Sequence, residues 1–237
     1  MHADQKPVSS FVSNKIELIR GHNQQNQSIN LLELDQEINP EEIIATAKNS
    51  RVEFSYDESI WRLGSLSVGK WINHNSFFLH SGCLLYCSKK EQVIHFSSRK
   101  SKATFQGKGT FIVESLENGG FKIIPLEVNG TISTEKGGDK KLHSSRLLLV
   151  LGSPSYFGDA YDIDLFLLLK SSRLIQAFPS PLPTFGKLKL ALFKQDLRLK
   201  AKYNALIGDA QTNDKLDIWA LSDEGNDGLD VESLLQK

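Results

Sequence analysis

The fold is decided by the stretch SRVEFSYDESIWRLG, residues 50–64. In its first half, valine, phenylalanine and tyrosine alternate with polar residues, which is the pattern of a strand with one buried face. Trp61 and Leu63 continue the alternation on either side of one arginine. This period of two predicts β-strands, because the apolar residues of a helix would recur every three or four positions.

The same pattern continues to residue 152. Glycines separate short apolar segments, and glycine tolerates the backbone angles that tight turns need. Asn118-Gly119-Gly120 predicts a hairpin between 110–116 and 121–128. About eight short strands predict a mainly β domain built as a sandwich, roll or solenoid. The apolar segments are 66–72, 77–79, 83–87, 92–96, 110–114, 121–128 and 147–151.

The periodicity changes after Gly152, where a helical extension is expected. Asp162 or Asp164 could cap a first, nearly all-apolar helix that runs to about Gln176. Capping and the helix dipole also explain why Asp159, Asp162 and Asp164 cluster, because the sequence lacks the ligand spacing of a calcium loop.

Prolines at 179, 181 and 183 predict an extended linker, and a second helix is expected from Leu188 to Leu206, with Gly208 ending it. Near the N-terminus, short strands are expected at 15–19 and 29–34. The predicted organisation is a loosely ordered segment 1–27, a β domain 28–152, a helical extension 153–208 and an acidic tail 209–237.

The composition is that of a globular chain. Its 237 residues carry 28 Lys and Arg against 28 Asp and Glu, so no overall charge points to nucleic acid. No stretch reaches the roughly 18 apolar residues of a membrane-spanning helix, and the first residues lack the apolar region of a signal peptide. Cys83 and Cys87 share one face of a predicted strand, about 13 Å apart, so we interpret both as small core residues rather than a disulfide.

Four further segments follow the first in an order that resembles the FecR domain family. They are FFLHSGCLLYCSKK at 77–90, ATFQGKGTFIVE at 103–114, FKIIPLEVNGTI at 121–132 and YDIDLFLLLKSSRLIQAFPSPLP at 161–183. The resemblance covers more than half of the chain and implies an all-β, solenoid-like roll without catalytic residues, in the periplasm or cell envelope of a bacterium. The chain departs from the family in its opened LEVNG at 126–130 and in lacking visible anti-sigma and transmembrane segments. It therefore resembles a free-standing relative, with a cytoplasmic location as the alternative.

Residues 39–47 receive opposite predictions. Asn39, Pro40 and Glu42 form the pattern of a helix start, with a capping residue, a first-turn proline and a capping box. The FecR resemblance implies a strand at Ile43–Ala47. We favour the strand, because burial in a sheet overrides a short local propensity.

Motifs for chemistry are weak throughout. Gly107–Thr110 (GKGT) lacks the spacing and helix of a phosphate loop, so a turn with close backbone approach is expected there. The six histidines show no metal-ligand spacing, and no serine lies in a hydrolase motif. We expect no catalytic, cofactor-binding or metal-binding residues, although a triad assembled in space would make the chain a hydrolase.

Two basic segments are the candidate binding surfaces. Residues 89–108 could meet an anionic glycan or lipid, although lysines that protect strand edges are the simpler interpretation. Residues 187–202 lie on an amphipathic helix that could touch a membrane, although a solvated face covered by the acidic tail is simpler. The possible anion-binding patch of the first segment comprises Lys89, Lys90, Arg99, Lys100, Lys102 and Lys108.

The leading functional hypothesis is a non-enzymatic, FecR-like envelope module that acts in protein–protein interaction, scaffolding or signal sensing. The alternative is a binding module for an anionic glycan or lipid that uses the patch at 89–108. The expected partner is a protein, with neither nucleic acid nor a cofactor.

Overall fold

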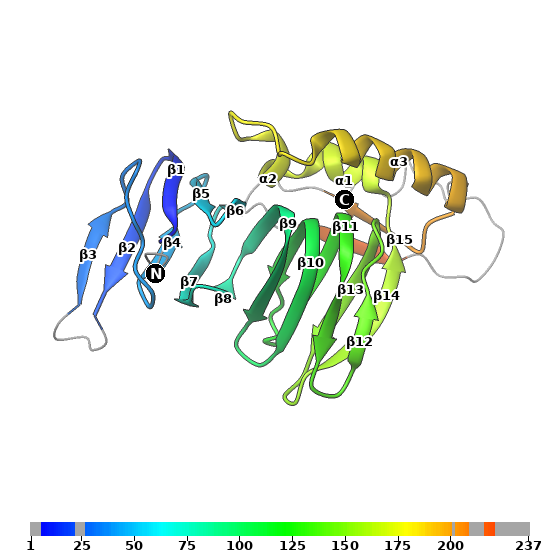
Figure 1. Ribbon diagram of the computed structural model, residues 1–237, viewed down its shortest axis with the longest axis horizontal. Helices are drawn as coiled ribbons and strands as arrows, with labels where there is room; N and C mark the ends of the chain where they lie inside the picture. Colours follow the sequence, from blue (N-terminus) through cyan, green and yellow to red (C-terminus); the bar gives the residue numbers. More distant parts are fainter. Residues whose placement is uncertain (1–5, 22–26, 201, 209–215, 221–237) are drawn as a thin grey trace.

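The computed structural model confirms a mainly β architecture with a short helical segment near the C-terminus (Figure 1). It describes residues 6–21, 27–200, 202–208 and 216–220. One sheet holds 14 strands. They are β1 (Val8–Ser13), β2 (Ile16–Arg20), β3 (Ser28–Leu31), β4 (Ile43–Thr46), β5 (Arg51–Tyr56), β6 (Ser59–Leu63), β7 (Val68–Asn73), β8 (Ser76–Ser81), β9 (Cys83–Ser97), β10 (Lys102–Ser115), β11 (Phe121–Thr134), β12 (Gly138–Lys141), β13 (Arg146–Leu151) and β14 (Tyr156–Asp162).

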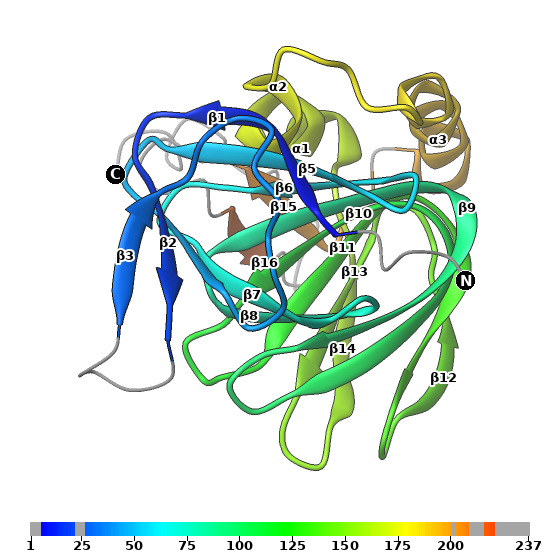
Figure 2. The ribbon, with the colours of Figure 1, turned by 60° about the vertical axis from the view of Figure 1, so that its left-hand side comes forward.

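The sheet folds over on itself because its long strands pair with different strands along their length and so belong to two layers. The first half of β9 pairs with β6, from Leu84 opposite Leu63 to Ser88 opposite Ser59. Its second half pairs in parallel with β8, where Phe96 lies opposite Phe77. Strands β5 and β1 continue the first layer, and β7, β4, β2 and β3 continue the second. The layers curve around a common interior but do not close, and β3 and β14 end the path (Figure 2).

The segment GKGT forms the bend in β10. The register against β9 jumps from Gly107 opposite Gln92 to Gly109 opposite Ser88. At Gly109 φ is +130°, and a Cβ atom would lie 2.2 Å from the carbonyl oxygen of Glu127. The predicted close backbone approach is confirmed, although it occurs inside a continuous strand and not in a turn.

Aromatic side chains fill the inside of the roll. Trp61 packs edge-on against Trp71 and Tyr86, with ring centroids 5.6 and 4.9 Å away. Phe54 reaches Trp71 from the first layer, and Phe77 reaches it from the second. The alternation of residues 50–64 thus buries one face of each strand in this interior, as the sequence predicts.

The opposite face of the first layer is also buried, because the C-terminal helices cover it (Figure 2). Cys83, Leu85 and Cys87 point to this second core and are almost fully buried, and the two cysteines form no disulfide. The interpretation of the cysteines as core residues is confirmed. The covering elements are α1 (Leu165–Ser171), α2 (Arg173–Gln176), α3 (Phe185–Leu199) and the two-stranded sheet of β15 (Ala205–Gly208) and β16 (Asp217–Ala220).

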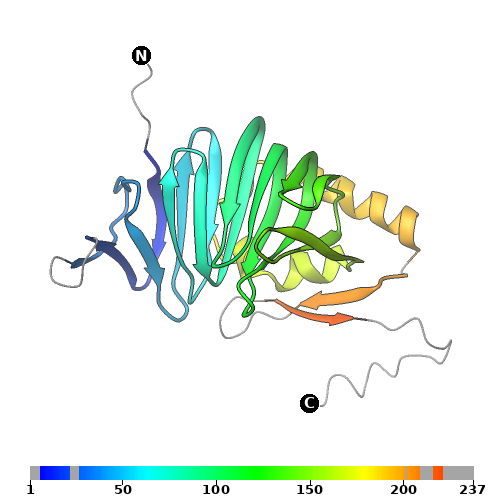
Figure 3. The same cartoon turned by 90° about the horizontal axis from the view of Figure 1, so that it is seen from below.

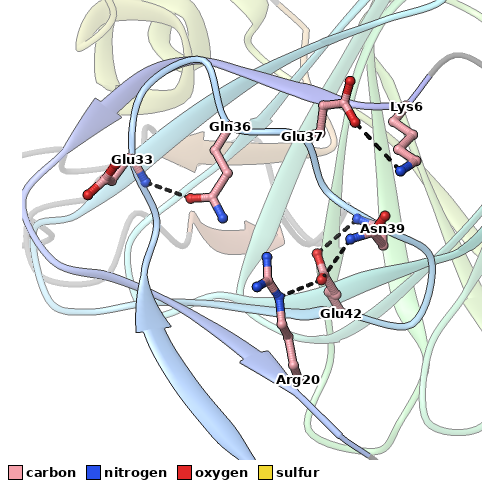
Figure 4. Close-up of polar contacts among 7 residues, drawn as sticks. All are labelled: Lys6, Arg20, Glu33, Gln36, Glu37, Asn39 and Glu42. Atoms are coloured by element: carbon pink, nitrogen blue, oxygen red, sulfur yellow. Dashed lines mark hydrogen bonds and ion pairs between the residues drawn. The ribbon is translucent and has the colours of Figure 1, made fainter.

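Residues 43–46 form strand β4, so the helix predicted from local signals is wrong. One of the two capping-box hydrogen bonds nevertheless exists, since Glu42 Oε2 accepts from the Asn39 N–H at 2.8 Å, and Arg20 Nε of β2 donates to Oε1 of the same carboxylate at 2.6 Å (Figure 4). They stabilise a turn that enters β4. Ile44 is fully buried there, and the pairing of β4 with β2 and β7 outweighs the local preference.

In the predicted helical extension 153–208, residues 156–162 form β14, the first helix begins at one of the two predicted caps, and the second helix ends earlier than predicted. Asp164 caps α1, its side chain accepting from the Leu167 N–H at 3.0 Å, and a proline-containing segment leads to α3. Helix α3 stops at Leu199, with Lys200 in the left-handed conformation, so the helix predicted to reach Leu206 is wrong at its end. Residues 205–208 instead form β15 beside α1 and β16 (Figure 3).

The sheet extends beyond both ends of the segment 28–152. Strand β2 confirms the prediction at 15–19, whereas the strand expected at 29–34 stops at Leu31. Strand β14 contains Asp159 and Asp162, so the prediction that all three aspartates serve the helix start holds for Asp164 alone. Most of the acidic tail lies outside the described residues.

Candidate functional site

A groove between α3 and the sheet is the best candidate for a binding site. It has a volume of about 530 Å³, within the range of small-ligand pockets. One wall is the face of α3 that carries Lys187, Lys194 and Arg198. The other wall comes from residues 127–129 of β11 and from 141–145, which end β12 and lead into β13.

Gln195 holds the α3 wall in place. Its side chain is buried, its amide nitrogen donates to the Ile163 carbonyl, and its amide oxygen accepts from the Leu165 N–H at 3.1 Å. Leu188 and Ala191 are buried on the same face of the helix. The orientation of α3 is therefore set from within the protein, and its remaining faces are free to present side chains outward.

Backbone contacts fix the opposite wall. The Leu142 N–H donates to the Gly130 carbonyl at 3.0 Å, and the Ser145 N–H donates to the Pro125 carbonyl at 2.8 Å. Ser145 is buried, with φ at +65°. A groove whose two walls are held this firmly needs little reordering when a ligand binds.

The groove is strongly basic. Lys141, Lys187 and Lys194 make no ion pair with any residue that the structure describes. Arg198 is paired with Asp162 at 2.8 Å, and Glu127 is the one acidic residue of the lining. Three lysines with no acidic partner among the described residues define a site that attracts an anion.

Next to the groove, α3 exposes an apolar stripe. We use this name for Leu190, Phe193 and Leu197, which are 52, 61 and 63% exposed. Their spacing of three and four residues places them on one side of the helix, opposite the buried Leu188 and Gln195. Leu190 also lines the groove, so the stripe and the groove are continuous. The exposed helix is seen across the upper ends of the strands in Figure 1.

The predicted anion-binding patch at 89–108 is distributed over both ends of a hairpin. Lys90 pairs with Glu58, and Lys108 pairs with Glu91 at 3.0 Å, near the bend. Lys102 lies six residues from Lys108 along β10, or about 20 Å. The remaining patch residues are Lys89, which is exposed near the bend, and Arg99 and Lys100, which lie in the loop beyond β9.

The loop positions have structural contacts of their own. Arg99 Nη2 donates to the carbonyls of Leu116 and Glu117, at 3.1 and 2.7 Å, and the side chain of Lys100 lies against Gly119. On the side of β9 away from β10, pairing with β6 ends at Ser88 and pairing with β8 begins at His95, so the edge-protection interpretation stays a prediction for Lys89 and Lys90. Residues 89–91 bulge out where the register against β10 jumps.

A buried ion pair that the sequence analysis missed fastens the helical segment to the sheet. Arg62 Nε donates to Glu53 Oε2 at 2.8 Å across β6 and β5, and Arg62 is fully buried. Its other nitrogens donate to the carbonyls of Leu174 and Ser180, at 2.9 and 2.6 Å, and its guanidinium lies 4.3 Å from the ring centre of Phe178. Desolvation lowers the pKa of Arg62, against the raising effect of Glu53. The alternation of Arg62 with Trp61 and Leu63 was the available signal, since it points the arginine to the face that the helices cover.

Lys122 and Glu114 form a second such pair, at 2.9 Å between β11 and β10. Lys122 donates to the Leu216 carbonyl at 2.6 Å, and Glu114 accepts from the Leu216 N–H at 3.2 Å. The pair therefore binds both backbone groups of Leu216, and it anchors the approach to β16 against the sheet.

No candidate metal site is present in the described part of the chain. Within residues 6–21, 27–200, 202–208 and 216–220, no three His, Cys, Asp or Glu side chains come together as metal ligands. His95 contacts Thr104 at 2.9 Å, while His2 and His22 lie outside the described residues. None of the described helices has the length and apolar character needed to cross a membrane.

Comparisons with protein-family models, with curated proteins and with solved structures find no match to this chain. The FecR resemblance therefore stays a prediction. The class that the fold defines is a rolled, open β-sheet with a helical cover, and its most prominent surface features are the basic groove and the apolar stripe.

Proposed function

We propose that this chain is a non-enzymatic, FecR-like module of the cell envelope that acts by contact with another macromolecule, most directly in protein interaction, scaffolding or sensing. The observation that carries the proposal is the apolar stripe of α3. Three large apolar side chains more than half exposed on one helix have no role in the cores of this molecule, and such patches are typical of interaction sites.

Photo-crosslinking in cells that naturally produce the protein tests this proposal. A crosslinking amino acid replaces Phe193, and a matched probe replaces Leu31, which is 62% exposed on the edge strand β3. We expect a discrete adduct from position 193 in the envelope fraction and none from position 31. Equal labelling at both positions, or a cytosolic protein without adducts, would refute the contact role.

Anion binding through residues 89–108 remains the alternative. The exposure of Lys89, Lys100 and Lys102 supports it, and the internal contacts of Lys90 and Lys108 weigh against it. Charge reversal at Arg99, Lys100 and Lys102 would abolish binding to an anionic glycan if this patch were the site. Unchanged binding would remove the alternative.

A further inference from the structure

We propose that the basic groove and the apolar stripe form one binding site for an anionic phospholipid surface, with a lipid phosphate in the groove and acyl chains against the stripe. The inference goes beyond the proposed function, because it assigns the same helix to a lipid surface and not to a protein. It differs from the predicted patch at 89–108 in both place and composition.

The groove supplies the phosphate-binding half of the site. Lys141 approaches from the end of β12, while Lys187 and Lys194 lie about two turns apart on the same face of α3. Lysine ammonium groups bind phosphate as point charges, and these three have no competing acidic partner among the described residues. Ser144 adds a hydroxyl to the lining.

The stripe supplies the apolar half. Leu190 belongs to both parts, so an acyl chain that leaves a phosphate in the groove meets Leu190 first and then Phe193 and Leu197. On the far side of the stripe, helical spacing places Lys189 together with Asp196, while Lys200 follows the end of α3. An apolar strip with a lysine on either side matches a membrane interface, because the ammonium groups reach the lipid headgroups while the apolar side chains enter the acyl boundary.

The combination of groove lysines with an exposed apolar stripe favours a membrane surface over a soluble anion as the ligand. A free phosphate or sugar phosphate would use the lysines and leave the stripe exposed to water. A membrane surface buries the stripe and neutralises the lysines at the same time. An acidic protein would meet the same charges, and the experiment separates it from lipid.

The experiment measures co-sedimentation of the full chain with phosphatidylcholine vesicles that contain or lack phosphatidylglycerol. We expect binding only when phosphatidylglycerol is present. The double variant Lys187→Gln, Lys194→Gln should weaken it by about 25-fold, roughly five-fold for each lysine. The matched control Lys89→Gln, Lys102→Gln removes the same charge from exposed lysines elsewhere. It should change binding less than two-fold, because salt screens the attraction between these distant lysines and the vesicle.

A second pair of variants tests the apolar half. Leu190→Ser with Phe193→Ser should abolish vesicle binding, whereas Ile29→Ser with Leu31→Ser alters equally exposed residues of β3 and should leave it intact. All altered residues are exposed, so unchanged circular dichroism and thermal unfolding are expected for each variant. Glycerol phosphate added to the solution should not displace the vesicles, because it offers nothing to the stripe.

The outcomes separate the inference from the proposed function. Equal loss of binding in the groove variant and its control would overturn the inference and assign binding to general charge. Absence of vesicle binding together with a protein adduct at position 193 would also overturn it while leaving the contact role intact. Absence of both would refute the two together, and displacement by glycerol phosphate alone would make the groove a site for soluble phosphates.

Discussion

Two buried ion pairs connect the sheet to the segment that covers it. Arg62 with Glu53, and Lys122 with Glu114, each bridge adjacent strands and use their remaining hydrogen-bonding capacity on backbone groups of the C-terminal segment. Burying charge costs free energy unless the charge is paired and hydrogen bonded. The covering segment can therefore adopt an irregular backbone there, because side chains of the sheet supply hydrogen-bond partners for its backbone groups.

The first prediction concerns Arg62. Arg62→Met should lower the free energy of unfolding by about 3–5 kcal/mol, because Glu53 would stay buried without its partner and two carbonyls would lose their donor. Urea denaturation measures the change. Arg62→Met combined with Glu53→Gln should recover part of the loss. Lys90→Met, which breaks the exposed pair with Glu58, should cost far less, because water and salt screen that pair, and an equal cost for both single variants would contradict this account.

The second prediction concerns pH and Tyr86. Burial raises the pKa of its phenol, against the lowering effect of the nearby Ser88 hydroxyl. A raised pKa in the folded state means that stability is complete below the unfolded pKa of about 10 and falls as pH rises above it, by up to about 1.4 kcal/mol per pH unit. Denaturation at increasing alkaline pH should show this slope. Tyr86→Phe should flatten it, and an unchanged slope in that variant would assign the alkaline loss to other groups.

At the scale of elements, the bend of β10 depends on glycine for a steric reason. The third prediction is that Gly109→Ala destabilises the protein by about 2–4 kcal/mol, because the new methyl group would collide with the Glu127 carbonyl at a positive φ. Gly186→Ala provides the contrast, since nothing lies within 4 Å of its added Cβ and alanine favours the helix. It should be neutral or stabilise by up to about 1 kcal/mol. Thermal unfolding measures the stability of both variants, and similar changes in stability for the two would mean that the bend tolerates a side chain.

The turn before β4 shows how a local signal is used in a different element. Glu42 accepts from the Asn39 N–H, as it would at a helix start, yet the chain continues as a strand. Capping contributes about 1 kcal/mol, whereas burying Ile44 between two paired strands contributes about 1.5–3 kcal/mol besides the ladder hydrogen bonds. The larger contribution decides the element.

At the scale of the whole molecule, the helical segment is part of the core. The outer face of the first layer carries Cys83, Leu85, Ile112, Ile124 and Leu126, which the helices and β15 bury. The helices thus convert a sheet with two apolar faces into a molecule with a mostly polar exterior, in which the apolar stripe and the exposed side chains of β3 are exceptions.

The fourth prediction follows from this cover. A chain ending at Asp162 should expose the outer face of the sheet, bind the dye ANS and aggregate, whereas the full chain should remain monodisperse. Size-exclusion chromatography and dye fluorescence measure both effects. The full chain with Leu190→Ser and Phe193→Ser controls for lost apolar surface and should stay monodisperse. A soluble truncated chain without dye binding would show that the sheet is stable alone.

The sequence by itself determined the features that depend on residues close together in the chain. A period of two specified the strands of residues 50–64, Asn118-Gly119-Gly120 specified a hairpin, and Asp164 specified the start of α1, because each depends on contacts within a few positions. The class of fold could be predicted from these signals.

Only the tertiary structure decided the rest, because its partners are distant in the chain. Arg62 donates to the Ser180 carbonyl, Lys141 lines the same groove as α3, and the residues of the basic segment 89–108 separate along a hairpin. Pairing between distant strands set β4 as a strand, and the seating of α3 on the sheet selected which side of that helix became the groove and which became the stripe. Periodicity describes the faces of one element, but packing between elements determines which face meets water.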